Sequence, residues 1–161
     1  MARTVTPASE RLWKRVNKTD DCWLWTGCLD RKGYGIIGDK IGAQKVSVRV
    51  HRLAYESLVR PLSADEQVDH RCHVRHCLNP EHLRPVTNKQ NQENRAGASR
   101  RSVSGHRGVY WDSTRKKWTA EVIHDGRKYF LGRFEDADTA AAAATAKRLE
   151  LFTHNDLDRA A

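Results

Sequence analysis

The segment VDHRCHVRHCLNPEHLRPVTNKQN, residues 68–91, decides how the first half of this chain folds. An aspartate and a histidine open it, two cysteines and a histidine follow, and an asparagine closes it. Thiols and imidazoles at short intervals are typical of metal sites, and an imidazole beside a carboxylate is typical of acid–base chemistry. The segment therefore predicts a small catalytic loop that is held in shape by a structural ion.

The cysteines and one histidine have the spacing of a structural zinc site. Cys72 and Cys77 are five residues apart, and His82 follows five residues later. Such sites take four Cys or His ligands in a tetrahedral array, so a fourth ligand must come from elsewhere. Cys22 and Cys28 are the candidates. We favour Cys22, because the tryptophan-flanked strand that is expected beside it can pack against the loop.

The residues before His82 predict how that ligand is aimed. Asn79 can cap a short helix, and Pro80 suits its first position. The resulting turn would direct His82 toward the two sulfurs, which gives Asn79 a structural role. His73 and His76 are nearby rival ligands that we rank lower.

A second metal is predicted at the ends of the segment. Asp69 and His70 end an expected strand, and Thr87 with Gln90 forms a T-x-x-Q capping box, so a helix is expected from residue 88 with Asn91 near its first turn. Asp69 and Asn91 are then placed to share one hard cation through oxygen atoms. Mg²⁺ suits so few protein ligands, and Mn²⁺ is the alternative. His70 stays available to take a proton from water.

The remaining chain reads as two patterns on either side of a basic stretch. Before the metal segment we expect helices at 8–16 and 51–59 and strands at 22–27, 33–37, 45–50 and 68–70, with a turn at 30–33. Residues 96–104 read as a linker. After it, strands are expected at 107–111, 116–123 and 127–132, then an alanine-rich helix at 135–151. Basic residues dominate the strands and acidic residues the last segment, which favours the sheet as the DNA-facing side.

The composition indicates a partner that is a polyanion. The 161 residues carry a formal net charge of +9, with a pI of about 9.7 and a mean hydropathy of −0.77. Neutralising phosphates releases condensed counterions, so such proteins commonly bind nucleic acid. No apolar run is long enough for a membrane helix, and the start lacks a secretory signal. We therefore expect a cytoplasmic protein whose cysteines bind metal rather than form disulfides.

The residues quoted above resemble a known nuclease family. The first ~95 residues resemble an HNH endonuclease of the ββα-metal type, and the Cys/His pattern resembles the His-Cys box homing endonucleases. The resemblance implies that His70 activates water, that Asn91, 21 residues later, binds the catalytic cation and that Asp69 is its second ligand. It also places Cys72, Cys77 and His82 among the structural zinc ligands. His51 and Arg52 are candidates for contact with a phosphate.

Residues 105–152 resemble the plant ethylene-response-factor, or APETALA-type, DNA-binding domain through RGVYW, KWTAEV, YFLGRF and the alanine-rich helix. In that family the sheet lies in the major groove and the helix packs behind it. The two linker arginines can in addition follow a phosphate backbone. The residues expected to contact DNA are Arg100, Arg101, Arg107, Tyr110, Arg115, Lys117, Thr119, Glu121, Lys128 and Phe130.

Together these expectations describe an α+β protein. A zinc-stapled ββα-metal nuclease module at 1–95 is followed by a basic linker at 96–104 and by a three-stranded antiparallel sheet packed on one helix at 105–155. We expect a site-specific, homing-type endonuclease for double-stranded DNA, encoded by a phage or other mobile element and acting in a bacterial host. A non-catalytic zinc-containing DNA-binding regulator and a dimeric restriction-type HNH nuclease are the alternatives. Monomer or homodimer stays open.

Overall fold

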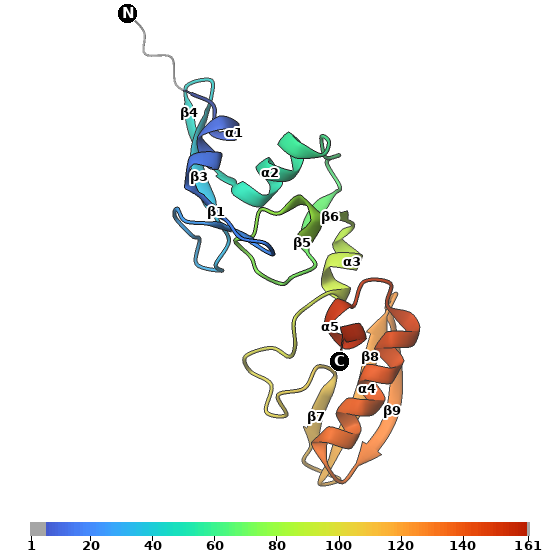
Figure 1. Ribbon diagram of the computed structural model, residues 1–161. Coiled ribbons are helices and arrows are strands. Elements are labelled where there is room, and N and C mark those ends of the chain that lie inside the picture. Colours follow the sequence, from blue (N-terminus) through green and yellow to red (C-terminus); the bar gives the residue numbers. More distant parts are fainter. Residues whose placement is uncertain (1–5, 161) are drawn as a thin grey trace, which may run out of the picture. The chain divides into compact units, whose positions relative to one another are not determined.

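The computed structural model describes residues 6–160 and divides into two compact units, Met1–Asn88 and Lys89–Ala161. Figure 1 traces both units along the chain. The division falls between Asn88 and Lys89, whereas the sequence placed the end of the first module at residue 95. The first five residues of that predicted module lie outside the described residues.

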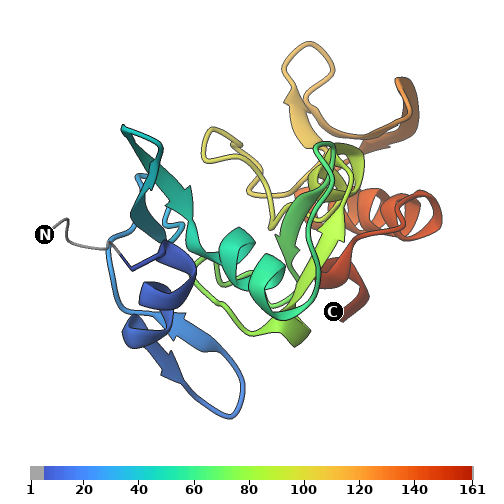
Figure 2. The same cartoon turned by 90° about the horizontal axis from the view of Figure 1, so that it is seen from above.

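The first unit consists of short helices and three two-stranded antiparallel sheets, in which β1 pairs with β2, β3 with β4 and β5 with β6. Figure 2 shows α2 beside β5, which it contacts. The elements in chain order are α1 Ala8–Arg11, the 3-10 helix η1 Leu12–Arg15, β1 Val16–Lys18, β2 Trp23–Trp25, β3 Ile36–Ile41, β4 Gln44–Arg49, α2 Val50–Leu58, β5 Gln67–His70, the 3-10 helix η2 Pro80–His82 and β6 Leu83–Val86.

Two small apolar clusters hold this unit together. The larger one buries Leu12, Trp25, Val50, Ala54 and Leu78, which come from η1, β2, α2 and the loop before η2. Burial of such side chains contributes roughly 1.5–3 kcal/mol each, so these few residues provide a large share of the hydrophobic stabilisation that is available to so small a module. The second cluster, Tyr55, Val68 and Leu83, fixes α2 against the β5–β6 pair.

The second unit is a three-stranded antiparallel sheet, ordered β7-β8-β9, packed on one long helix. The turn between β8 and β9 contains only Asp125 and Gly126, which have φ angles of 50° and 73°, as a two-residue hairpin turn requires. The elements are α3 Asn88–Glu93, whose first residue closes the first unit, β7 Val109–Asp112, β8 Lys117–His124, β9 Arg127–Phe134, α4 Ala137–Leu151 and α5 Asp156–Ala160.

The alanines of α4 let the helix approach the sheet closely. Ala140 and Ala144 are fully buried against Val109, Ala120 and Val122 of the sheet. The helix starts where the Asp136 carboxylate accepts a hydrogen bond from the Thr139 backbone N–H at 2.7 Å.

The structure is a mixed α/β fold with small antiparallel sheets, and two of its departures from the sequence expectations lie in the first unit. The helix expected at 8–16 is split into α1 and η1, and its last residue, Val16, opens β1 instead. The strand expected at 33–37 starts only at Ile36, because Asp30 Oδ1 accepts backbone hydrogen bonds from Lys32 at 2.8 Å and Tyr34 at 3.0 Å, which keeps that stretch in a turn. Among residues 6–160, none of the helices has the length and apolar character to cross a bilayer.

Candidate metal centre and catalytic pair

Three cysteines and one histidine converge in the first unit. The ligand atoms of Cys22, Cys72, Cys77 and His82 all lie within 4.8 Å of one another. Cys28 is exposed and is not part of this group. Of the two cysteines that the sequence left open, the fold therefore brings Cys22 to the other three.

Backbone pairing explains why Cys22, and not Cys28, lies beside the other three ligands. The Trp25 N–H donates to the His76 carbonyl at 2.9 Å and the Leu78 N–H donates to the Trp23 carbonyl at 2.8 Å, so β2 runs beside the loop that carries Cys77. Asn79 secures both sides of this arrangement. Its Nδ2 donates to the Asp21 carbonyl at 2.7 Å and its Oδ1 accepts from the Glu81 N–H at 3.1 Å at the start of η2.

The donor set and its distances fit zinc. With Zn–S bonds of about 2.3 Å and Zn–N bonds of about 2.0–2.1 Å, a tetrahedral angle separates sulfur from nitrogen by about 3.5–3.6 Å. His82 Nδ1 lies 3.6 Å from Cys22 Sγ and 3.6 Å from Cys77 Sγ. The other ring nitrogen, Nε2, lies 3.2 Å from Asp21 Oδ1, and such a carboxylate orients a metal-binding imidazole. The Cys₃His cluster could therefore bind zinc.

The thiols show why a cation belongs among them. A hydrogen bond from the Cys72 thiol lowers the pKa of Cys77 to about 4, and the Asn79 N–H, 3.4 Å from Cys77 Sγ, acts in the same direction. Burial raises the pKa of Cys22 to about 11, and the pKa of Cys72 is raised by its hydrogen bond to Cys77. Sulfurs this close disfavour one another's ionisation, and three thiolates at this spacing need a positive ion between them.

Asp69 and His70 are the last two residues of β5, and both are buried. Asp69 is opposite Arg84 on β6, and the guanidinium donates to Asp69 Oδ2 from Nη2 at 2.9 Å and from Nε at 3.1 Å. A buried carboxylate needs such a partner, because desolvation otherwise penalises its charge. Sequence reasoning had assigned Asp69 to a cation and had not identified Arg84.

The imidazole of His70 is fixed by the same loop that carries the thiols. Its Nε2 lies 3.2 Å from the Cys77 carbonyl oxygen, which can only accept, so Nε2 carries the proton and Nδ1 is left as an acceptor in the neutral ring. Burial lowers the pKa of His70, which favours this neutral form. A neutral imidazole with one free acceptor nitrogen has the properties of a general base.

An aromatic group packs around His70. The ring centroid of His51, at the start of α2, lies 4.8 Å from that of His70, and Tyr34 lies 5.4 Å from His51 and 6.1 Å from His70. His51 is buried, and within residues 6–160 its Nδ1 has no hydrogen-bond partner. Burial lowers the pKa of His51 to about 3, and repulsion from Arg49 and from His70 in its protonated form acts in the same direction. His51 is therefore a neutral packing partner of His70.

Basic side chains flank this group. The Arg49 guanidinium lies 4.6 Å from the centre of the Tyr34 ring and that of Arg75 lies 5.5 Å from it. Arg52, which the sequence suggested for phosphate contact, is instead paired with Glu56 at 3.2 Å and donates to the Glu66 carbonyl. Sequence reasoning missed Tyr34, Arg49 and Arg75. The sequence signal that could have identified Tyr34 is its place as an aromatic residue directly after the turn at residues 30–33.

Asn91, the other expected metal ligand, lies in α3 and belongs to the second unit. Its role beside Asp69 and His70 stays a prediction. So does the role of the sheet residues expected to contact DNA, whose surroundings are now visible.

On the outer face of the sheet, Tyr110 is 46% and Phe130 54% exposed, and the Glu121 carboxylate accepts from Tyr110 and pairs with Lys128, both at 3.1 Å. Thr119 is buried between its cross-strand neighbours. Of the other expected DNA contacts, Arg100, Arg101 and Arg115 are exposed and Lys117 is paired with Glu135 at 2.7 Å.

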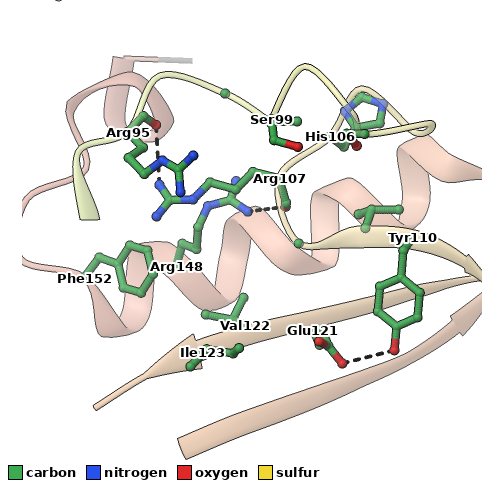
Figure 3. A pocket seen from close by; sticks show the side chains of 15 residues that line it. Arg95, Ser99, His106, Arg107, Tyr110, Glu121, Val122, Ile123, Arg148 and Phe152 are labelled. Atoms are coloured by element: carbon green, nitrogen blue, oxygen red, sulfur yellow. Dashed lines mark hydrogen bonds between the residues drawn. The ribbon is translucent and has the colours of Figure 1, made fainter. Parts of the chain in front are cut away.

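A pocket of about 480 Å³ opens in the second unit between the 95–108 segment and the sheet. Figure 3 shows the two arginines at its base, where Arg148 donates to the Arg107 carbonyl at 2.8 Å and Arg107 turns toward the Arg95 carbonyl. Arg148 is also paired with Asp158 at 2.6 Å. Arg107, expected at the DNA surface, is therefore engaged with backbone groups inside its unit.

Comparison with known proteins bears on the metal segment. Residues 48–93, which span α2, the β5–β6 pair, three of the four cluster residues and Asn91, match the model of a family described as HNH endonuclease. Neither the comparison with curated proteins nor that with solved structures gave a match. The match at residues 48–93 supports an HNH nuclease. Nucleases of this family use divalent metals and act on DNA.

Proposed function

We propose that this protein is a site-specific, metal-dependent endonuclease of the homing type that hydrolyses phosphodiester bonds in double-stranded DNA. The observation that carries the proposal is the hydrogen bond between His70 Nε2 and the Cys77 carbonyl, 3.2 Å long, inside a segment that matches the HNH family. That bond gives His70 the tautomer a general base needs. A mobile-element origin, such as a phage, and action inside a bacterial host are part of the proposal.

In the proposed reaction, His70 Nδ1 takes a proton from the water that attacks phosphorus, the bond between phosphorus and the 3′ oxygen breaks, and the leaving oxygen gains a proton from solvent. Asp69 and Asn91 would hold one Mg²⁺ or Mn²⁺, which would stabilise the negative charge on the phosphoryl and leaving oxygens. Arg49 and Arg75 are the basic groups beside the histidine that suit phosphate binding.

The cluster of Cys22, Cys72, Cys77 and His82 is proposed as a structural zinc site. It joins β2 to the loop between β5 and β6, and that loop supplies the carbonyl that orients His70. In a unit with two small apolar clusters, metal binding of this kind contributes on the order of 10 kcal/mol to folding.

The second unit is proposed as the DNA reader. The exposed Tyr110, Phe130 and Lys128 on the outer face of a three-stranded sheet support an interface of the ethylene-response-factor type, because a sheet of this size fits the major groove. Arg100 and Arg101 would contact phosphates from the segment before the sheet.

The test is incubation of the full-length protein with DNA that contains its site, found by mapping the ends produced from phage and host DNA in the presence of Mg²⁺. Wild type is expected to cut, and His70→Ala is expected to bind the same DNA with unchanged affinity but to cut it at least about 100-fold more slowly. His76→Ala, a histidine in the same loop, is the control and should cut normally.

If wild type binds its site and leaves it intact, the endonuclease proposal fails and the DNA-binding regulator becomes the better account. Sedimentation of the protein–DNA complex, together with the count of strands cut per binding event, separates a monomeric homing enzyme from a dimeric restriction-type nuclease.

A further inference from the structure

The end of helix α3 is held by the unit that follows it. Arg107, just before β7, donates from Nη1 to the Glu93 carbonyl at 2.8 Å and from Nη2 to the Gln92 carbonyl at 2.9 Å. The last carbonyls of a helix lack partners within the helix, so this guanidinium supplies them. Its own position is fixed by the Phe152 ring, whose centre is 5.2 Å away. The contact anchors α3 to the start of the sheet.

The last residue of α3 is anchored a second time, through its side chain. The Glu93 carboxylate is buried, and its Oε2 accepts from the Thr153 N–H at 2.9 Å, the Thr153 hydroxyl at 3.1 Å and the His154 N–H at 3.3 Å. His124 Nε2 at the end of β8 lies 3.5 Å from the other oxygen, Oε1. Glu93 Oε2 thereby connects α3 to the segment after α4, because donors around a buried carboxylate oxygen stabilise its charge. Within residues 6–160, Glu93 Oε1 and His124 Nε2 have no hydrogen-bond partner.

Two further contacts connect α3 with the same unit. Lys89 Nζ lies 2.7 Å from Asp125 Oδ1 in the β8–β9 turn, although both side chains are largely exposed and the pair contributes little stability. Directly after the helix, Asn94 Oδ1 accepts from the Asp156 N–H at 3.0 Å. The helix is therefore held from the start of β7, from the hairpin turn and from the segment after α4.

These anchors matter because α3 has only six residues. Helices shorter than about 12 residues are marginal in water, since too few hydrogen bonds offset the cost of nucleation. The conformation of α3, and hence the placement of Asn91 within it, depends on tertiary contacts. Among these contacts, the Glu93 side chain is buried and accepts three hydrogen bonds, and Arg107 donates to two carbonyls at the end of the helix.

We propose that Glu93 and Arg107 are positioning residues for DNA cleavage, which hold the helix that carries Asn91. This inference rests on the proposed function, in which Asn91 is a ligand of the catalytic cation. The second unit then serves the reaction twice, by binding DNA and by fixing a metal ligand, and changes at Glu93 weaken the use of metal without weakening DNA binding.

The test compares full-length Glu93→Ala, Glu93→Gln and Thr153→Val with wild type. The Mg²⁺ concentration for half-maximal cleavage and kcat are measured at saturating DNA, and the Kd for DNA is measured without Mg²⁺. Glu93 acts through the helix that carries Asn91, so Glu93→Ala should raise the Mg²⁺ requirement by about 10-fold, the lower end of the loss seen when a metal ligand loses its supporting contacts, with Kd unchanged. Glu93→Gln keeps an accepting oxygen and should recover part of the loss. Thr153→Val, which removes one donor and keeps the fold, should show a smaller shift in the same direction.

Amide hydrogen exchange gives a readout that does not depend on activity. Residues 89–94 should exchange faster in Glu93→Ala, while the amides of β8 keep their protection. Glu150→Gln is the matched control, because Glu150 is an exposed carboxylate on α4 that pairs with Lys147, and it should change neither exchange nor Mg²⁺ dependence.

An active wild type whose Glu93→Ala variant keeps its Mg²⁺ dependence and its exchange in α3 overturns the inference alone. A rate loss that follows an equal loss of DNA affinity also overturns it, because the second unit then acts only as a tether. A wild type that binds DNA and leaves it uncut overturns the proposed function, and the inference with it.

Discussion

At the scale of single residues, Cys77 has two tasks. Its sulfur belongs to the Cys₃His cluster, and its carbonyl accepts from His70 Nε2. The first task is predicted by the spacing of the cysteines, whereas the second depends on the fold, and together they link the cluster to the proposed base. Of the two cysteines outside the 68–91 segment, Cys22 is buried and belongs to the cluster, and Cys28 is exposed and does not.

Replacing these cysteines separates the cluster from ordinary thiols. Cys77→Ser and Cys22→Ser should each lower the zinc content and the melting temperature of the purified protein, since three remaining ligands bind the ion weakly. Cys28→Ser should retain wild-type zinc and stability, because Cys28 is exposed and outside the cluster. Metal analysis with thermal unfolding measures both, and full zinc in Cys77→Ser would contradict the assignment.

The buried His51 predicts acid sensitivity of the first unit. Its folded pKa of about 3 lies below the unfolded value of about 6.5, so the unfolded chain binds more protons in that window. The contribution of neutral His51 to the free energy of unfolding is fully present above pH 6.5 and is lost as the pH falls toward 3. The titratable and charged groups that face the ring are His70, Arg49, Arg52 and, with opposite sign, Asp30. The lowered pKa of His70 acts in the same direction.

The expected result is a smaller loss of unfolding free energy between pH 7 and pH 5 in His51→Gln than in wild type. Urea unfolding at the two pH values measures it. The control His76→Gln should keep the wild-type difference, and an equal pH dependence in all three proteins would contradict the role of His51.

At the scale of elements, patterns with a local cause were predictable and those with a distant cause were not. The helix start expected at residue 88 follows from the T-x-x-Q pattern at residues 87–90, and α3 begins at Asn88. Cys72, Cys77 and His82 were found by spacing. Cys22 was favoured over Cys28 because of its tryptophan-flanked strand, and the cluster does contain Cys22. The backbone pairing of β2 with residues 76–78 and the burial of Thr119 between β7 and β9 could not be predicted from the sequence. Such contacts join residues far apart in sequence, which no local pattern records.

The approach of β7 to β8 yields a test at this scale. Gly108 has φ of +81°, and a Cβ there would lie 2.5 Å from the Glu121 carbonyl oxygen. Gly105 has φ of +71° but open space around the same position. Gly105→Ala should therefore cost about 1–2 kcal/mol of unfolding free energy from backbone strain alone, and Gly108→Ala clearly more. Urea unfolding followed by tryptophan fluorescence compares the two, and equal costs would show that the close approach is unimportant.

At the scale of the whole molecule, the net charge of +9 and the exposed aromatic face of the sheet together suit a phosphate-rich partner. Two modules were predicted from a change in sequence pattern, and their bounds stay a prediction. The structure divides into two compact units between Asn88 and Lys89, and Arg107 and Thr153, which hold α3 in the second unit, lie well beyond that point in the sequence.

Salt should weaken DNA binding steeply if phosphate contacts dominate. In a plot of log Kd against log salt concentration, the slope for Lys128→Gln should be smaller than that of wild type by roughly 0.9, which corresponds to the loss of one phosphate contact. Lys147→Gln is the control, because Lys147 lies on the helix side and is paired with Glu150. A slope near zero for wild type would argue against a phosphate-dominated interface.

The double task of Cys77 has a consequence for the living cell. On the proposed function, any shortage of zinc would let the loop relax and release the His70 ring, whatever the supply of magnesium. The protein would then be inactive in a zinc-depleted cell, so that cleavage would depend on zinc as well as on magnesium.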